Sequence, residues 1–194
     1  MKLVVGLGNP GPKYETTRHN AGFLALDYLI DEWKATGPNA VQNGETWTAT
    51  VSGEKVLLLK PLTYMNNSGT TVGSLYKFYK LKPEDLIVIH DDLDLKTNAF
   101  RIKTGGGTAG HNGLKSIDAH VGAAQTNYHR LRVGIGRPAP GSPVQVVDFV
   151  LQPYTDAEIQ GLNTLFTKLA HAAELLVRGD SVAAMNQFNR EDKK

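Results

Sequence analysis

Short apolar runs of strand length alternate with longer amphipathic stretches along the whole chain of 194 residues. Many of the runs end at glycine, proline or small polar residues, and the apolar residues of the longer stretches recur at helical spacing. We therefore expect strands at 3–7, 47–51, 55–60, 86–90, 99–103 and 128–135, and helices at 17–33, 66–80, 113–120 and 156–178. This alternation predicts an α/β fold: a single domain spanning 1–194, with a mixed, twisted β-sheet flanked by helices on both faces.

Three further segments carry local expectations. Thr16 or Thr17 is expected to cap the first helix, because a hydroxyl can accept a hydrogen bond from the first helical turn. Residues 136–143 are rich in proline and glycine and are expected to form a surface loop. The tail, residues 189–194, is strongly polar and is expected to be disordered.

Composition limits the compartment and the chemistry. The chain has no cysteine, which excludes disulfide bonds, a thiolate nucleophile and a cysteine-ligated zinc ion. Too few apolar residues precede Gly6 for a signal peptide or a membrane span, so we expect a cytoplasmic protein with no membrane partner. The 21 Lys and Arg residues against 19 Asp and Glu give a formal net charge of +2, so a surface that binds nucleic acid would have to be local.

Four polar segments follow predicted strands, at residues 9–19, 64–68, 90–94 and 105–112. In α/β sheets the ligand crevice lies beyond the carboxyl ends of the strands. We therefore expect these segments to contribute the functional site.

The first of these segments contains a dinucleotide-binding pattern, G-x-G-x-x-G, at Gly6 to Gly11. In that motif a helix opens at the glycines, and an acidic residue about 20 positions later ends the next strand. Here Pro12 delays the helix, and the acids at a suitable distance, Asp31 and Glu32, fall within or at the end of a helix. A nucleotide-dependent oxidoreductase is therefore a minor alternative, which predicts nicotinamide binding.

The glycine-rich segment from Gly105 to Ser116 resembles a phosphate-binding loop only superficially. A Walker A loop requires a lysine directly after its last glycine, and Lys115 does not occupy that place. The glycines either let the backbone approach a ligand or form a flexible surface turn, and the sequence leaves both interpretations open.

Two other catalytic patterns are incomplete. Asp91, Asp92 and Asp94 offer carboxylates to a divalent cation, but no further acids lie near them in the sequence, so no metal site is expected. Asp92 and Asp94 are instead expected to be solvated, with one of them capping a turn. The chain has no G-x-S-x-G motif, so a serine hydrolase of that type lacks its nucleophile.

His19 has chemically useful neighbours in the predicted fold. Asn9 precedes it on the same loop, Asn66 begins the second predicted helix, Asp91 follows a strand, and Asn112 lies in the glycine-rich segment. One imidazole, one carboxylate and three amides are sufficient for water-mediated acyl transfer without metal or cofactor. Spacing assigns no role to the other histidines, which are His90, His111, His120, His129 and His171.

Several motifs closely resemble the bacterial peptidyl-tRNA hydrolase family, in order and over nearly the whole chain. They are Gly-Leu-Gly-Asn-Pro-Gly at 6–11, Tyr14, Thr-Arg-His-Asn-Ala-Gly at 17–22, Lys-Pro-x-Thr-Tyr-Met-Asn-x-Ser-Gly at 60–69, His-Asp-Asp-Leu-Asp at 90–94, Gly-Gly-Gly-x-x-Gly-His-Asn-Gly-Leu-Lys-Ser at 105–116 and Arg-Leu-Arg-Val-Gly-Ile-Gly at 130–136. Beyond residue 150 the resemblance is weakly diagnostic. Thr108 and Ala109 stand in a loop that varies in the family, which leaves no role vacant.

The resemblance implies a monomeric enzyme, with no obligate protein partner, that releases peptides from peptidyl-tRNA dropped by ribosomes. It implies that His19 is the catalytic histidine and Asp91 its supporting aspartate. It further implies substrate-binding roles for Asn9, Tyr14, Met65, Asn66 and Asn112, with Tyr14 near the 3′-terminal adenosine or the ester. Lys103 and Arg132 match the basic pair that binds tRNA phosphate, and Arg101 is a neighbouring basic residue.

These residues suggest a mechanism. A neutral His19 takes a proton from the water that attacks the ester carbonyl, and Asp91 holds the other ring nitrogen. The asparagine amides hold the peptide backbone and, from one of them, the developing oxyanion; which amide does so is open. The main alternative is an RNA-binding module with a degenerate site, which would need the basic residues but neither His19 nor Asp91.

Overall fold

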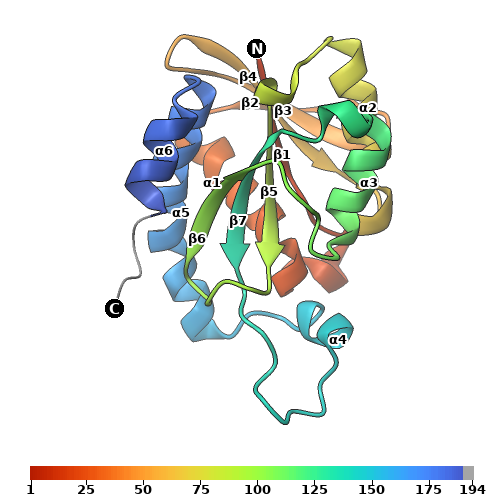
Figure 1. Ribbon diagram of the computed structural model, residues 1–194, viewed down its shortest axis with the longest axis vertical. Helices are drawn as coiled ribbons and strands as arrows, with labels where there is room; N and C mark the ends of the chain where they lie inside the picture. Colours follow the sequence, from red (N-terminus) through yellow and green to blue (C-terminus); the bar gives the residue numbers. More distant parts are fainter. Residues whose placement is uncertain (190–194) are drawn as a thin grey trace.

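A seven-stranded sheet runs through the part of the chain that the computed structural model describes, residues 1–189 (Figure 1). The order of its strands is β2-β3-β4-β1-β5-β7-β6. The four central strands pair in parallel, and the outer pairings are antiparallel, so the expected mixed sheet is confirmed. The strands are β1 (Lys2–Gly6), β2 (Thr36–Val41), β3 (Gly44–Val51), β4 (Glu54–Pro61), β5 (Leu86–Asp92), β6 (Phe100–Thr104) and β7 (His129–Gly134).

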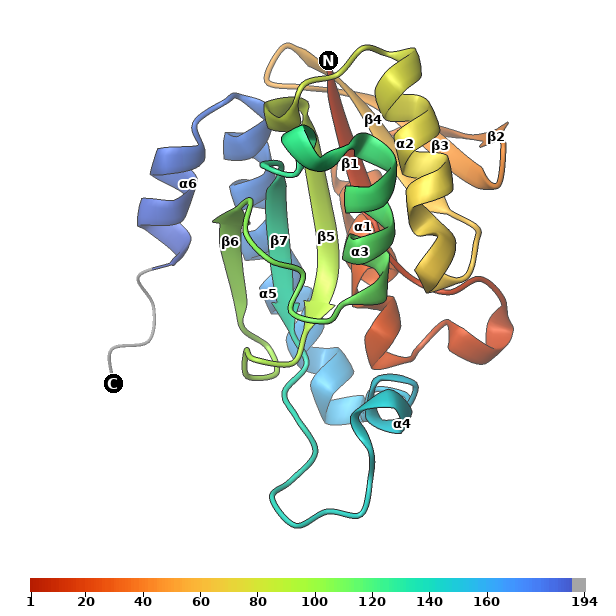
Figure 2. The same ribbon diagram turned by 45° about the vertical axis from the view of Figure 1, so that its right-hand side comes forward.

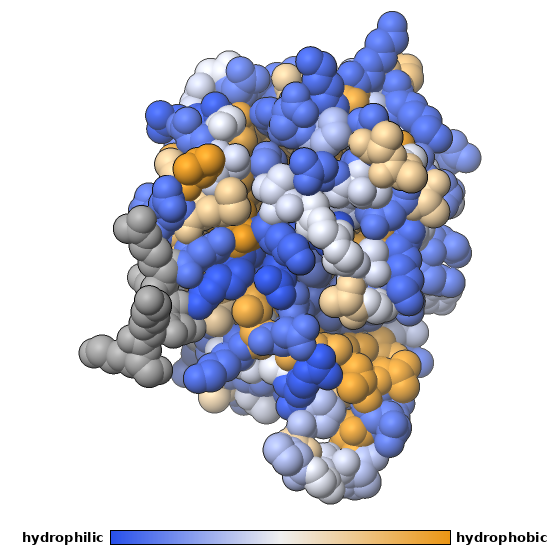
Figure 3. Space-filling view, viewed as in Figure 1, coloured by the Kyte–Doolittle hydropathy of each residue, from blue (hydrophilic) through white to orange (hydrophobic). Residues whose placement is uncertain are grey.

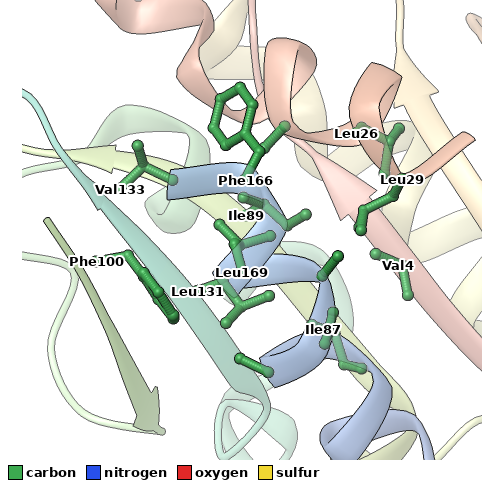
Figure 4. Packing of buried hydrophobic residues seen from close by; sticks show 14 of the residues in the cluster. Val4, Leu26, Leu29, Ile87, Ile89, Phe100, Leu131, Val133, Phe166 and Leu169 are labelled. Carbon is green, nitrogen blue, oxygen red and sulfur yellow. The ribbon is translucent and has the colours of Figure 1, made fainter. Parts of the chain in front are cut away.

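Helices cover both faces of this sheet, as the sequence predicts (Figure 2). Side chains alternate between the faces of a strand, so Leu3 and Val5 of β1 join one core cluster and Val4 joins the other. The first cluster lies under α2 (Ser68–Phe78) and α3 (Asn112–Val121). The second, part of which Figure 4 shows, lies under α1 (Ala21–Glu32), α5 (Asp156–Val177) and α6 (Ser181–Phe188). None of the helices in the described part of the chain combines the length and apolar character needed to span a membrane.

One strand and two α-helices of the described residues have no counterpart in the sequence prediction. The edge strand β2 contains Gly37 and Pro38, which normally interrupt strands, and most of its residues are exposed. Helix α4 (Val146–Val150) has only five residues, too few to show helical periodicity. Helix α6 packs against β6 and α5.

The expectation of disorder fails for the first residue of the tail. Asn189 accepts a hydrogen bond from the backbone nitrogen of Ile102 at 2.9 Å and donates one to its carbonyl oxygen at 2.8 Å. These bonds hold the end of α6 against the edge strand β6. Residues 190–194 lie outside the described part of the chain.

The predicted first helix begins differently from the expectation. A 3-10 turn, Arg18–Asn20, precedes α1, and neither threonine side chain caps the helix. The hydroxyl of Thr17 donates instead to the carbonyl of Tyr14. Helix α1 approaches the sheet closely because Gly22 has no side chain: a Cβ there would collide with the backbone of Leu7 and Ile89. This close approach holds His19 at the carboxyl edge of the sheet.

Candidate functional site

The main cavity lies at the carboxyl edge of the sheet and has a volume of about 630 Å³. Asn9, His19, Asp91 and Asn112 all line it, so four of the predicted site residues meet there. The cavity is also lined by residues that carry no predicted site role, among them His90, Leu93, Asp94, Ala109, His111, Arg137, Val146, Val147, Val150 and Leu151.

His19 and Asp91 form the predicted pair. The Nδ1 atom of His19 lies 3.0 Å from each carboxylate oxygen of Asp91. Asp91 is the penultimate residue of β5 and is only 3% exposed, whereas 15% of the His19 side chain is exposed. With Nδ1 bound to the carboxylate, Nε2 is the ring nitrogen available to the cavity.

His19 and Asp91 each shift the pKa of the other. Burial lowers the pKa of His19, but the charge of Asp91 and its hydrogen bond raise it by more, so the pKa lies above the ordinary value of 6.5. Burial raises the pKa of Asp91, but the charges and hydrogen bonds of His19 and His111 hold it far below the ordinary value of 3.8. Asp91 is therefore an anion throughout the physiological pH range.

His111 is the functional candidate that sequence spacing misses. Its Nδ1 atom accepts hydrogen bonds from the backbone nitrogens of Gly113, at 3.1 Å, and Leu114, at 3.3 Å, and so caps α3. A neutral imidazole that accepts at Nδ1 carries its proton on Nε2. That nitrogen lies 2.8 Å from Oδ1 of Asp91, so His111 donates to the same carboxylate as His19. Its place two residues before the predicted helix at 113–120 is the available signal for a capping role.

His90 completes a layer of three histidines around Asp91. Its Nδ1 atom lies 2.7 Å from the backbone carbonyl oxygen of Asp91, and its ring meets that of His111 edge to face at 4.9 Å. Burial, with the charge of His111 as a second cause, lowers the pKa of His90 to about 3. The ring of His90 is therefore neutral near pH 7 and donates from Nδ1.

His19, Asp91 and His111 lie close enough together to hold a metal ion as far as distance alone is concerned. A histidine ligand must offer a lone pair to the metal. The Nε2 atom of His111 carries the ring proton, because Nδ1 caps α3. These hydrogen bonds disfavour a metal ion at this cluster.

Asn9 is fixed by its neighbours. Its backbone exchanges two hydrogen bonds with the side chain of Asn20, at 2.8 and 3.0 Å. Its Oδ1 atom accepts a hydrogen bond of 2.7 Å from the backbone nitrogen of Met65. The Nδ2 group of Asn9, which donates to no residue in the described part of the chain, is therefore its free hydrogen-bond donor.

The other predicted substrate residues lie outside the cavity lining. Met65 is 4% exposed and contributes its backbone nitrogen to Asn9. Asn66 is exposed in the 3-10 turn before α2. Tyr14 is half-buried and packs edge to face against Tyr64, with ring centres 6.4 Å apart.

The two predicted phosphate-binding residues lie on the edge strand β6 and on its neighbour β7. Lys103 is exposed and lies against Gly106, where a Cβ would meet its Cε atom. Arg132 is 25% exposed and donates from Nε to Asp92 at 2.7 Å. Asp92 also accepts a bond from the backbone of Asp94, so the expected turn cap is confirmed. The expectation that Asp92 is solvated is wrong, because it is only 8% exposed.

Arg130 holds the glycine-rich segment in place. It is 2% exposed and donates to the carbonyl oxygens of Gly106, at 2.9 Å, and Gly107, at 2.8 Å. The end of the same segment, from Thr108 to Asn112, lines the cavity. A buried arginine therefore fixes the loop that carries His111.

One side of the cavity is apolar. Val146, Val147 and Leu151 of the α4 region are exposed and line it, and Figure 3 shows the hydrophobic surface over α4. Arg137 and Asp94 form an exposed ion pair of 2.6 Å beside them. The cavity thus offers an imidazole and amides on one side and aliphatic side chains on the other.

Known proteins resemble this sequence over almost its full length. The model of the peptidyl-tRNA hydrolase family matches residues 3–194. The peptidyl-tRNA hydrolase of Geobacillus kaustophilus is 47% identical over 189 residues, which cover 97% of this chain and 100% of that protein. The peptidyl-tRNA hydrolase of Bordetella avium is 48% identical over 193 residues, which cover 97% of this chain and 91% of that protein.

Solved structures of peptidyl-tRNA hydrolases also share the fold of this chain. A crystal structure of peptidyl-tRNA hydrolase from Acinetobacter baumannii superposes with a TM-score of 0.89 at 42% identity, covering 98% of this chain and 95% of that one. A peptidyl-tRNA hydrolase in complex with N-propanol superposes with a TM-score of 0.90 at 41% identity, covering 100% and 97%. Sequence and fold together establish that this chain belongs to the peptidyl-tRNA hydrolase family of enzymes.

Proposed function

We propose that this enzyme hydrolyses the ester between a peptide, or an N-blocked aminoacyl group, and the 3′ end of tRNA, with His19 as the general base. The observation that carries the proposal is the 3.0 Å contact between His19 Nδ1 and Asp91. An anionic carboxylate at that distance accepts a hydrogen bond from Nδ1–H and so keeps the proton on Nδ1 and Nε2 unprotonated. Nε2 is then free to accept a proton from water.

The reaction proceeds through a tetrahedral intermediate. As water attacks the ester carbonyl, Nε2 of His19 takes its proton, and Asp91 stabilises the imidazolium that forms. The bond between the carbonyl carbon and the 3′ oxygen of tRNA then breaks, and His19 returns the proton to that oxygen. The products are free tRNA and a peptide with a new carboxyl group.

The amides and the apolar side of the cavity position the acyl group. Asn9 offers a donor, Nδ2, to a carbonyl oxygen of the substrate, because its own oxygen is bound to Met65. Asn112 lies on the rim of the same cavity, and Asn66 in the exposed turn next to Met65. The aliphatic side chains of the α4 region suit the apolar side chains of a peptide.

The tRNA body binds along β6 and β7 in this proposal. Lys103 and Arg132 occupy alternate positions to the core residues Ile102, Leu131 and Val133, so both project on the sheet face that carries α3. Tyr14 and Met65 are proposed to lie near the 3′-terminal nucleotide. The proposal includes a monomeric enzyme that recycles dropped peptidyl-tRNA in the cytoplasm.

A turnover assay tests the general base. N-acetylaminoacyl-tRNA is incubated with the wild-type protein, His19→Ala and His171→Ala, with and without a chelator. His171 is an exposed histidine of α5 and serves as the matched control. We expect His19→Ala to lose about 10²- to 10⁴-fold in rate with its fold intact, and His171→Ala to match the wild type. A folded His19→Ala protein with near-wild-type turnover, or activity abolished by the chelator, would contradict the mechanism.

A further inference from the structure

The residue directly before His19 is a buried arginine with an unusual set of contacts. Arg18 is 7% exposed, and its guanidinium lies over the ring of Phe149 at 4.6 Å and near the ring of Tyr154 at 5.9 Å. Its NH2 group donates to both carboxylate oxygens of Glu158, at 3.0 and 3.2 Å. A buried arginine that is stacked and paired in this way is held in one orientation.

The same arginine binds the chain that leaves α4. Its NH1 group donates to the carbonyl oxygen of Pro153 at 3.2 Å, and its backbone nitrogen donates to that of Gln152 at 3.0 Å. Thr17 pairs with Pro153 as an isolated antiparallel bridge, and the backbone nitrogen of Tyr154 donates to Thr16 at 2.8 Å. Residues 16–18 and 152–154 are therefore joined as a short two-stranded ribbon.

This ribbon connects two segments that line the main cavity. His19 follows it at one end, and Val150 and Leu151, which line the cavity, precede it at the other. Glu158 anchors the ribbon to α5, because it also forms the capping box with Thr155 at the start of that helix. Movement at Arg18 would therefore change the separation between the imidazole and the aliphatic side chains.

We propose that Arg18 is a positioning residue that fixes the α4 region relative to His19 and thereby tunes the enzyme toward acyl groups with bulky apolar side chains. The inference rests on the proposed function, because it assumes that the acyl group occupies this cavity. A bulky side chain that contacts Val147 or Leu151 places its ester carbonyl at a distance from His19 that the ribbon sets. A small acyl group makes no such contact and is placed by the amides alone.

Arginine is required for this role because of its shape. Its planar group donates in several directions at once, here to a carboxylate and a carbonyl, while both of its faces remain free to stack on rings. A lysine would keep the charge, but it has one nitrogen in place of two, so it could not reproduce the separate contacts of NH2 with Glu158 and of NH1 with Pro153, and it would lose the planar group that stacks on the rings. Arg18→Lys therefore weakens the placement of α4 and retains a cation in the buried site.

Selectivity between acyl groups shows whether Arg18 positions the α4 region or only stabilises the fold. The ratio of kcat/KM for N-acetylphenylalanyl-tRNA to that for N-acetylglycyl-tRNA is determined for the wild type, Arg18→Lys and Arg178→Lys. Arg178 is an exposed arginine at the end of α5 whose partner is Asp180, so it controls for the substitution itself. We expect Arg18→Lys to lower the ratio roughly 10-fold or more, and Arg178→Lys to leave it unchanged.

The pH profile provides a second readout. The pKa of His19 is shifted by burial and by Asp91. Arg18→Lys should therefore leave the midpoint of the acid limb of kcat/KM in place while the selectivity ratio changes. A loss that is equal for both acyl groups would overturn the proposal and leave Arg18 a stabilising residue only. A displaced midpoint with an unchanged ratio would also overturn it.

A second variant covers the case in which Arg18→Lys does not fold. In Glu158→Gln the side chain can still accept a hydrogen bond in the capping box, but the charge of the pair with Arg18 is lost. A lowered selectivity ratio in this variant supports the proposal, and an unchanged ratio overturns it. If the wild-type protein hydrolyses neither substrate, the proposed function fails before the role of Arg18 is reached.

Discussion

His19 and Asp91 meet at 3.0 Å although 72 positions of sequence separate them. The first residue comes from a 3-10 turn before α1, and the second from the end of the central strand β5. Their contact joins a loop to the most deeply buried part of the sheet. The residue that raises the pKa of His19 therefore belongs to the sheet, whereas His19 itself does not.

Asp91→Asn should change both the rate and its pH dependence. In the proposed mechanism His19 must be neutral to act, so kcat/KM of the wild type should fall as the pH drops through its pKa, which lies above 6.5. Without the charge of Asp91, burial remains and lowers the pKa of His19, so the acid limb should move below pH 6.5. The rate at pH 8 should fall by roughly 10²-fold or more, because the tautomer is no longer fixed. A pH-rate profile and a proton NMR titration of His19 measure both effects, and an acid limb that stays in place would refute the assignment.

His111→Asn should move the same limb in the opposite direction. Asparagine is a good cap and can preserve the start of α3, but it is too short to replace the 2.8 Å bond to Asp91. With one donor removed, the carboxylate interacts more strongly with His19, whose pKa should rise. We expect the acid limb to shift toward higher pH with the helix content unchanged by circular dichroism. A shift toward lower pH would show that His111 does not act through Asp91.

The double variant Lys103→Ala with Arg132→Ala should weaken binding of tRNA substrates. Each contact to phosphate releases condensed counterions, so KM should rise and its dependence on salt concentration should become less steep. A short aminoacyl-nucleotide analogue lacks the tRNA body, and its KM should change much less. Lys55→Ala, which removes an exposed lysine near the start of β4, provides the control. Equal effects on tRNA and on the analogue would count against these two residues.

Gly22→Ala should destabilise the fold. The added Cβ would collide with backbone atoms of Leu7 and Ile89, which cannot move without separating α1 from the sheet. Overpacking of this kind costs typically about 1–3 kcal/mol. Gly107→Ala is the matched control, since a Cβ there meets no described atom within 4 Å. Denaturant unfolding of the two variants gives the comparison, and equal midpoints would mean that the helix can shift at little cost.

The sequence predicts the architecture, and the residues that gather at the carboxyl ends of the strands, for a physical reason. Parallel strands end at one edge of a sheet, so polar residues that follow separate strands must gather there. Asn9, His19 and Asp91 fulfil this expectation. Asn112 follows β6, which runs antiparallel to β7, and it reaches the cavity through the glycine-rich segment instead. The family motifs carry the assignment of the substrate, which strand order alone does not supply.

Other features depend on contacts that a linear pattern does not record. Nε2 of His111 is a donor because Nδ1 accepts hydrogen bonds at the start of a helix. The position of the ring proton therefore depends on contacts that only the folded structure shows. Asp92 is buried because Arg132 of the neighbouring strand neutralises it. Helix α4 follows a loop rich in glycine and proline and is too short for periodicity to detect. The ribbon that joins Arg18 to Pro153 links segments separated by more than half the chain.

The side chain of Asn189 also bears on self-association. An edge strand presents unpaired amide and carbonyl groups, on which another chain can template a new strand and begin to aggregate. On β6, one primary amide accepts from and donates to the backbone of Ile102, as the backbone of a neighbouring strand would. The side chain at the end of α6 thus makes the hydrogen bonds that a neighbouring strand would make at this position. An incoming chain finds one fewer unpaired amide and carbonyl on β6 to bind.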